Sequence, residues 1–272
     1  MSTWFETIGV ILIAIGSIGL GRYISGLRKS WWILGYLFSL GLITALILAR
    51  YQNRLYFIEP FSWVTAGRGR FVIICISVSM GMTIPLSRLP HRLEKILVCL
   101  LMFVFITWFS ILPFFAPILI KNRLSSIKTT LDSDGVCRQS TSYTCGPAAA
   151  VTALGKLGLS ADEGELAVLS YSSPVIGTLP VCLTSALQSR YGSEGLKCQY
   201  RRFETIEQLK NTGVTLAVVK IAFLLDHCLA VLNVTDDIVT VADPLTGVRS
   251  MSREQFEKIW RYSGIVIERE SI

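Results

Sequence analysis

Four apolar segments in the first half of the chain constrain its fold more than any other feature. They are predicted as membrane-spanning helices at residues 5–24, 31–50, 71–87 and 96–120. A helix needs about 20 mostly apolar residues to cross a bilayer. The apolar runs within the first and third segments, 7–20 and 71–86, are shorter and are expected to use interfacial residues or tilt. A signal peptide is the alternative for the first segment, but residues 1–6 lack the basic stretch that begins one. We therefore expect an all-α, four-span region over residues 1–123, with both of its ends on one side of the membrane.

The charges of the chain are divided unevenly between its two halves. Residues 1–123 hold three acidic residues against twelve Lys and Arg, whereas residues 124–272 hold 16 acidic residues against 14 Lys and Arg. The net charge of +7 therefore comes from basic residues that flank the apolar segments, where they are expected for topological reasons. This distribution argues against a nucleic-acid partner. The basic residues are divided almost equally between the two sides of the predicted membrane, so they barely favour an orientation. We nevertheless expect the C-terminal domain in the cytoplasm.

A domain of mixed secondary structure follows the apolar half. Residues 124–134 are polar and are predicted as a linker, and residues 135–272 are long enough to build a core of their own. Helices are predicted first: from Cys145 to Leu157, from a capping box at 160–163, and from Pro180 to Tyr191. Short β-branched runs follow at 216–221, 228–234, 238–242 and 265–267, and another capping box at 252–255 opens a last helix. Helices followed by antiparallel strands predict an α+β domain.

Cys145 is the candidate nucleophile of this domain. It directly precedes Gly146, Pro147 and a run of alanines, so it is predicted to lie at the start of a helix. The positive end of the helix dipole stabilises a thiolate at such a position. His227 is the single histidine of residues 124–272, and Asp243 follows it by sixteen residues. A cysteine, a base and a residue that orients the base are the parts of a cysteine peptidase.

Strand geometry allows His227 and Asp243 to meet. If residues 228–234 and 238–242 form a hairpin that turns at Asp236, His227 lies opposite Leu245. Asp243 is then its diagonal neighbour on the same face, about 7–8 Å away between backbones. A slip of one residue would separate the two, and Asp226 is a weaker rival because adjacent strand residues point to opposite faces.

Gln139 lies six residues before Cys145 and is a candidate donor to an oxyanion. Its side-chain amide would act together with the backbone N–H of Cys145 at the helix start. The other cysteines of this half, Cys137, Cys182, Cys198 and Cys228, match no zinc-ligand spacing and are expected to be small packing residues. We therefore expect no metal and no cofactor.

These motifs together resemble the bacteriocin-processing, double-glycine leader peptidases, a family of papain-like cysteine peptidases. The resemblance covers residues 135–268 and rests on Gln139 with Cys145–Ala149, on Asp226–Leu232, and on Val241–Gly247. It implies a papain-like fold, with Cys145 as nucleophile, His227 as base, Asp243 as orienting residue and Gln139 in the oxyanion hole. Thr144 stands where the family often has Asp. The best-known members are N-terminal domains of ABC exporters, whereas this chain has no P-loop and carries the domain after its apolar segments.

The function expected is hydrolysis of peptide bonds through a Cys145 thioester by a membrane-anchored enzyme, at Gly-Gly or Gly-Ala sites if the resemblance extends to specificity. A papain-like acyl or peptidyl transferase is one alternative, because it shares the chemistry up to the thioester. A non-catalytic peptide-binding module is another. The expected partners are a peptide or protein substrate near the membrane, the lipid bilayer and a separate membrane transporter. The expected location is a bacterial inner membrane, crossed several times.

Overall fold

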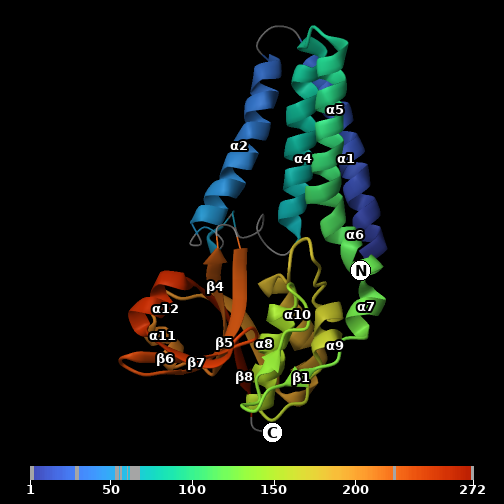
Figure 1. Ribbon diagram of the computed structural model, residues 1–272. Helices are drawn as coiled ribbons and strands as arrows, with labels where there is room; N and C mark the ends of the chain where they lie inside the picture. The colour runs from blue at the N-terminus through green and yellow to red at the C-terminus, as the bar shows by residue number, and fades with distance from the viewer. Residues whose placement is uncertain are drawn as a thin grey trace. The chain divides into compact units, whose positions relative to one another are not determined.

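The computed structural model describes residues 3–27, 31–52, 55, 57–59, 61, 68–222 and 225–270. Contacts between these residues divide the chain into two compact units, Met1–Ile118 and Leu119–Ile272. Figure 1 follows the chain through both, from the long helices of the first to the helices and strands of the second. Each unit is described by itself below.

The first unit is built from helices in the part of it that the structure describes. They are α1 (Thr3–Ser25), α2 (Trp31–Tyr51), α4 (Gly69–Thr83) with the 3₁₀ turn η2 (Ile84–Arg88), and α5 (Arg92–Ile106) with the π-helical turn η3 (Thr107–Ile111) and α6 (Leu112–Leu119). Four stretches are long and apolar enough to cross a membrane: Trp4–Ser25, Trp31–Ala49, Gly69–Arg88 and Arg92–Leu119. The prediction of an all-α, apolar first half is confirmed.

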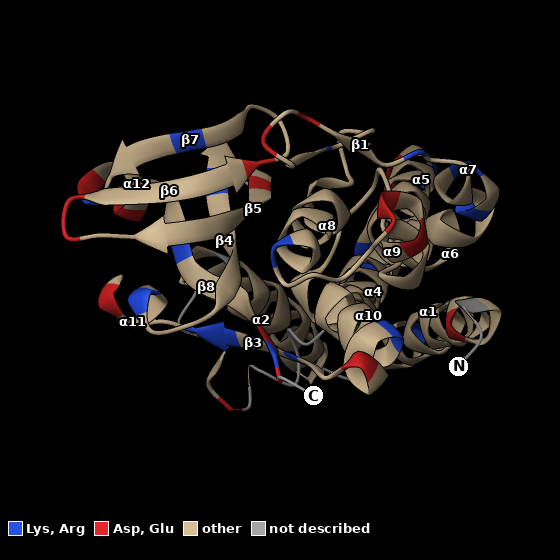
Figure 2. Ribbon diagram, turned by 90° about the horizontal axis from the view of Figure 1, so that it is seen from below, with Lys and Arg blue, Asp and Glu red and all other residues tan. Residues whose placement is uncertain are grey.

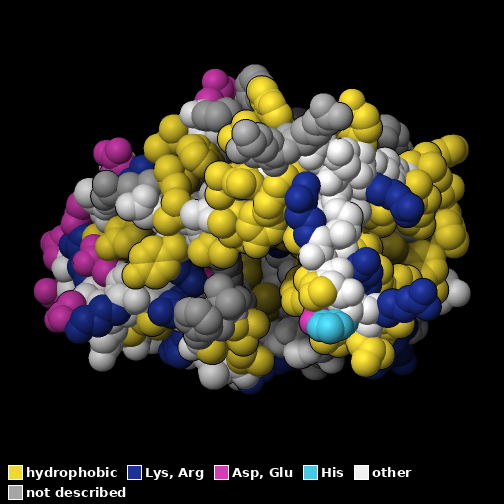
Figure 3. Space-filling view, turned by 90° about the horizontal axis from the view of Figure 1, so that it is seen from above, with side chains coloured by type: hydrophobic (Ala, Val, Ile, Leu, Met, Phe, Trp, Pro, Cys, Tyr) yellow, Lys and Arg dark blue, Asp and Glu magenta, His cyan; other side chains and the backbone are white. Residues whose placement is uncertain are grey.

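The surface of these helices suits contact with lipid. Large apolar side chains are exposed along them, among them Phe38 at 57% and Phe103 at 69%. Figure 3 shows many hydrophobic side chains on the face seen from above, together with Lys, Arg, Asp, Glu and other polar groups. Small residues let the helices approach closely, since a Cβ atom on Gly21 would lie 3.0 Å from Thr83 Cβ, and one on Gly81 would lie 3.2 Å from Ser39 Cβ.

The second unit joins helices to an antiparallel sheet, so the α+β prediction is confirmed. Its helices are α7 (Lys121–Ser125), α8 (Cys145–Lys156), α9 (Glu163–Leu169), α10 (Pro180–Tyr191), η4 (Gly192–Glu194), α11 (Glu207–Lys210) and α12 (Arg253–Ile259). The short strands β1 (Thr130–Leu131) and β2 (Cys137–Arg138) pair with each other. Six more form a sheet in the order β3-β8-β4-β5-β6-β7. They are β3 (Leu196–Arg202), β4 (Val214–Ala222), β5 (Leu225–Val234), β6 (Ile238–Asp243), β7 (Gly247–Ser252) and β8 (Trp260–Arg269).

Both faces of the six-stranded sheet are covered. Leu216 and Ala230 point into one core, with α8 and α10, whereas their neighbours Ala217 and Val231 point into a second core with Phe256 of α12. This alternation is the two-residue period of a strand buried on both faces. In Figure 2, α8 lies against the sheet next to β5, and Lys, Arg, Asp and Glu are scattered over the surrounding elements. The start of α8 (Cys145) and the start of β5 (His227) interact within this region.

Several local predictions agree with the structure, and the predicted start of one helix is wrong. The helices α8 and α10 lie where predicted, and Ser252 with Gln255 forms the predicted capping box of α12. At α9, however, the N-cap is Asp162, whose side chain accepts a hydrogen bond from the N–H of Glu165. Residues 124–134, predicted as a linker, carry the end of α7 and β1 and pack as part of the second unit.

Candidate active site

Cys145 is the first residue of α8 and its side chain is half-buried. The N-cap, Thr144, makes no side-chain hydrogen bond to the helix. Its hydroxyl instead accepts a hydrogen bond of 3.1 Å from the N–H of Thr141, in the preceding loop. The first N–H groups of a helix have no partner within the helix, so the start of α8 offers donors and a positive dipole end beside the thiol.

The packing around Gly146 requires a small residue directly after Cys145. A Cβ atom there would lie 3.1 Å from Thr178 Cβ and 3.2 Å from Leu183 Cδ2, closer than nearly all real contacts. Thr178 also donates a hydrogen bond of 3.1 Å to the carbonyl of Tyr143, just before the cysteine. The segment before α10 therefore holds the start of α8 in place.

The β5–β6 hairpin brings His227 and Asp243 together. Ala230 pairs with Ala242, which is the register predicted for a turn centred on Asp236, and a bulge nearer the turn shifts only the pairs beyond it. The Nε2–H of His227 donates to Oδ1 of Asp243 over 2.8 Å, and both side chains are about 5% exposed. The predicted register is confirmed.

The charges in this region determine the protonation state of the pair. Burial acts to lower the pKa of His227, but hydrogen bonds with Asp243 and Cys145, and the charges of the same two groups, raise it to about 9. Burial acts to raise the pKa of Asp243, but hydrogen bonds from His227 and the N–H of Leu245, and the charges of His227 and Arg249, lower it to about 2. At neutral pH the site therefore holds an imidazolium and a carboxylate. Since Nε2 is engaged by Asp243, the nitrogen left for Cys145 is Nδ1.

Gln139 lies directly after β2, beside the same hairpin. Its backbone N–H donates to the carbonyl of Pro244 over 3.1 Å, which ties it to the residue after Asp243. One hydrogen of its side-chain amide goes to the carbonyl of Thr141 over 2.7 Å, and the amide has a second hydrogen to donate. Among the described residues, its Oε1 is buried without a hydrogen-bond partner.

Three charged residues near the site were not singled out by sequence. Arg249 of β7 lies 3.1 Å from Oδ2 of Asp243. Arg138 hydrogen-bonds the carbonyl of Leu245. Glu163 is fully buried and accepts hydrogen bonds of 2.8 Å from both the N–H and the hydroxyl of Ser140. No sequence signal marks these contacts, because each joins segments whose meeting depends on the complete fold.

Three other residues considered from the sequence, Asp226, Cys137 and Cys198, have partners or surroundings that set them apart from the His227–Asp243 pair. Asp226, the rival to Asp243, forms an ion pair with Arg261 at 3.0 Å. Burial raises the pKa of Cys198 to about 12, and burial, followed by the charge of Glu163, does the same for Cys137. These two thiols therefore stay protonated and unreactive near neutral pH. Within the described part of the chain, no group of three or more His, Cys, Asp or Glu could hold a metal ion.

Comparison with known families decides what the second unit is. The model of the peptidase C39 family matches residues 134–271. The chain belongs to the peptidase C39 family. This membership supports a peptidase-type function, and the resemblance drawn from the motifs is confirmed at the level of the family.

Two similar proteins come from Methanothermobacter species. This C39 protein is 33% identical over 148 residues to an uncharacterised protein of Methanothermobacter marburgensis, a match that covers 53% of this chain and 95% of the relative. It is 31% identical over 143 residues to an uncharacterised protein of Methanothermobacter thermautotrophicus, covering 53% and 94%. The similarity covers about half of this chain and nearly all of each relative.

Solved structures of similar domains give weaker matches. The peptidase domain of Streptococcus ComA, a bifunctional ABC transporter, is 20% identical, with a TM-score of 0.42 over 49% of this chain and 96% of that domain. A double-glycine-motif protease from an AMS/PCAT transporter, solved with its leader peptide, is 16% identical, with a TM-score of 0.43 over 53% and 96%. A putative C39-like peptidase from Bacillus anthracis is 14% identical, with a TM-score of 0.43 over 54% and 100%.

Proposed function

We propose that the protein is a membrane-anchored cysteine peptidase whose active site consists of Cys145, His227, Asp243 and Gln139. One observation carries the proposal: in a domain of the C39 family, the imidazole held by Asp243 also interacts with the thiol at the start of α8. A cysteine, an imidazole and an acid that orients the imidazole form the arrangement that activates a thiol nucleophile.

The proposed reaction begins from a thiolate–imidazolium pair. Sγ of Cys145 attacks the scissile carbonyl carbon, and the oxyanion accepts hydrogen bonds from the N–H of Cys145 and the amide of Gln139. Nδ1–H of His227 protonates the leaving amine as the C–N bond breaks, which leaves a thioester. His227 then takes a proton from water, whose oxygen attacks the thioester carbonyl. The acid product leaves, and the proton on His227 restores the starting pair.

Asp243 acts on the imidazole and does not touch the substrate in this scheme. Its Oδ1 fixes the ring so that Nδ1 faces the thiol, and its charge stabilises the imidazolium that exists before attack. The ring is about 5% exposed, so water competes little for these hydrogen bonds. A ring held this way keeps its orientation through both half-reactions.

The substrate we infer is a peptide or membrane-protein segment close to the bilayer. The four apolar helices suggest that the second unit is tethered to the membrane, since it begins at Leu119, where the last of them ends. Cleavage after Gly-Gly or Gly-Ala, and service to a separate transporter, are proposed from the resemblance to leader peptidases. In the ComA and AMS/PCAT proteins named above, the peptidase domain belongs to a transporter.

We place the second unit in the cytoplasm. A reactive thiol favours a reducing compartment, and the described cysteines of this unit are free. Protease treatment of right-side-out and inverted vesicles measures this directly. Digestion of the second unit in inverted vesicles alone is expected, whereas its digestion in right-side-out vesicles would place it outside.

The catalytic assignment is tested with the full chain in lipid nanodiscs and a library of fluorogenic peptides that includes Gly-Gly and Gly-Ala sites. Cys145→Ala is expected to abolish hydrolysis and Cys198→Ala, the matched control, to keep it. A thiol-reactive peptide electrophile should label Cys145 alone. Turnover at the wild-type rate in Cys145→Ala would refute the assignment, and absence of labelling would favour a peptide-binding module.

The same assay separates hydrolysis from acyl transfer. Mass spectrometry of the products is run with and without amines as acceptors. Free acid as the main product supports a peptidase. An amide that forms in preference to the acid would identify a transferase, with the same four residues in the same roles up to the thioester.

A further inference from the structure

The catalytic residues come from two parts of the second unit that are joined by β2. Cys145 and Gln139 belong to the segment around α8, whereas His227 and Asp243 belong to the β5–β6 hairpin and the turn after it. On one side, the N–H of Cys137 in β2 donates to the hydroxyl of Thr152 in α8 over 2.9 Å. On the other side, β2 contacts the turn after Asp243.

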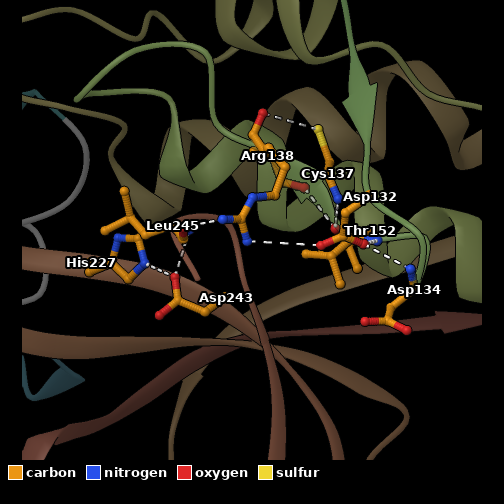
Figure 4. A network of polar contacts seen from close by, with 10 residues as sticks. Asp132, Asp134, Cys137, Arg138, Thr152, His227, Asp243 and Leu245 are labelled. Carbon is orange, nitrogen blue, oxygen red and sulfur yellow. Dashed lines mark hydrogen bonds and ion pairs between the residues drawn. The ribbon is translucent and has the colours of Figure 1, made fainter. Parts of the chain in front are cut away.

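Arg138 makes the side-chain contact of β2 with that turn. Figure 4 shows its guanidinium between the turn that carries Leu245 and the carboxylate of Asp132. One arm donates to the carbonyl of Leu245, and the other lies 3.8 Å from Oδ2 of Asp132. The N–H of the same Leu245 donates over 2.9 Å to Oδ1 of Asp243, the atom that also accepts the bond from His227. One residue of the turn therefore connects the arginine to the catalytic pair.

The other end of this contact is also fixed. The second carboxylate oxygen of Asp132, Oδ1, accepts hydrogen bonds from the N–H groups of Asp134 and Val136 at 3.0 and 2.9 Å. Gly247, which has a φ of +89°, closes the turn, and a Cβ atom there would lie 3.1 Å from both Arg138 Nη1 and Asp132 Oδ2. The turn therefore packs directly on the Arg138–Asp132 pair.

The exposure of the Arg138–Asp132 ion pair limits how much it can add to stability. The side chains of Arg138 and Asp132 are 36% and 24% exposed, and an ion pair of this length at such exposure adds little stability. A planar guanidinium, however, holds two acceptors in a fixed direction, which the single ammonium group of lysine does not. Arg138 is therefore expected to affect the geometry of the turn more than the stability of the fold.

We propose that Arg138 is a positioning residue that holds the turn after Asp243 against β2, and so sets the position of the His227–Asp243 pair relative to Cys145 and Gln139. This inference rests on the proposed peptidase function. It places a requirement for arginine at a position that touches neither the substrate nor the reacting atoms.

The test compares Arg138→Lys and Arg138→Met with Arg190→Met in the full chain. Arg190 has a similar exposure of 41% and an ion pair with Glu165, in a different part of the second unit. Loss of positioning is expected to lower kcat on the order of 10-fold to 100-fold in both Arg138 variants, with KM within about threefold. Arg190→Met should keep kcat within about twofold. A third variant, Arg138→Ala, leaves space for a free guanidinium, and added methylguanidinium should recover part of its lost rate.

A second readout does not depend on a peptide substrate. The rate at which iodoacetamide alkylates Cys145 is measured against pH, because it reports the thiolate and the imidazolium beside it. Among the described residues, His227 and Cys228 interact with this thiol, and Asp243 and Arg249 act on it through His227. None of these four residues is changed in these variants. Slower alkylation, with a shifted pH profile, is expected for both Arg138 variants and not for Arg190→Met.

The outcomes separate this inference from the proposed function. If the wild type hydrolyses no peptide, the proposed function fails and the alkylation profile alone decides the role of Arg138. Wild-type kcat and alkylation in both Arg138 variants would overturn the inference. So would a loss of activity that only follows a loss of folded protein, measured by the unfolding midpoint against that of Arg190→Met.

Discussion

The ionic pair at the centre of the site predicts how His227 titrates. In Asp243→Asn, the neutral amide must turn its NH₂ group either toward Arg249 or toward Nε2 of His227 and the N–H of Leu245, and each of these is a donor. The substitution therefore removes the negative charge and also leaves at least one donor without an acceptor. The pKa of His227 is therefore expected to change more than it would from loss of the charge alone.

The structure gives the size of the change. The rise in the pKa of His227 from an ordinary 6.5 to about 9 corresponds to about 3 kcal/mol in favour of the charged ring, at about 1.4 kcal/mol per pH unit. Asp243 and Cys145 provide this preference against the opposing effect of burial. Without the carboxylate, less opposes the lowering effect of burial, and we expect the pKa of His227 to fall to about 7 or below.

Selective labelling makes the measurement direct, because the chain has two histidines. In the full chain labelled with ¹³C at histidine Cε1, two resonances are followed from pH 5 to about 10, and His91→Gln assigns them. Asp226→Asn is the matched control, since that carboxylate neighbours His227 in the chain but pairs with Arg261. A midpoint near 9 in Asp243→Asn, or one near 6.5 in the wild type, would refute the reasoning.

The same pair predicts how stability depends on pH. The pKa of His227 is raised on folding, so its contribution is complete below pH 6.5 and is lost as pH rises through about 9. The pKa of Asp243 is lowered, so its contribution is complete above pH 3.8 and is lost as pH falls through about 2. Denaturant unfolding of the second unit, followed by tryptophan fluorescence, should show the alkaline loss in the wild type. It should be absent in Asp243→Asn, and its persistence there would assign the loss to other groups.

Three further predictions concern the surroundings of the thiol. Gly146→Ala is expected to destabilise the second unit by about 1–3 kcal/mol through overpacking, whereas Gly155→Ala, on the same helix with open space around it, should be neutral or stabilising in denaturant unfolding. Glu163→Gln should cost about 1–3 kcal/mol because it weakens two buried hydrogen bonds, and Glu165→Gln, which is exposed, less than about 0.5; equal costs would contradict this. Gln139→Glu replaces a donor by an acceptor and should lower kcat about 100-fold at nearly constant KM; an unchanged kcat would exclude an oxyanion role.

Local patterns predicted the parts of the site that depend on neighbouring residues. The start of α8 follows from the Pro and Ala residues after Cys145. The meeting of His227 and Asp243 follows from the length of one hairpin, because the residues near the site keep a register centred on Asp236. The bulge in β5 was not predicted, but it lies between the turn and the end of the hairpin that carries His227 and Asp243, so the register of that end was unaffected.

Contacts between distant segments account for the parts that were missed. Ser160 resembles a helix cap in sequence, yet α9 starts later because the hydroxyl of Thr129 accepts from the N–H of Glu163 and donates to Asp162. Arg138 and Leu245 are 107 positions apart, and no local pattern relates them. The strand β7 was overlooked because its burial does not alternate, which left Arg249 without a predicted position beside Asp243.

The place of β8 in the sheet has a consequence for biosynthesis. It is the last strand in chain order, yet it lies between β3 and β4 and pairs with both. Until the ribosome has made β8, β3 has no neighbour, and the cores on both faces lack Ile265 and Trp260. The four apolar helices precede it by about 140 residues and would enter the bilayer first. In the proposed membrane-anchored peptidase, the nascent chain would therefore be anchored before its sheet is complete, and Cys145 would become active only after the protein had reached the membrane.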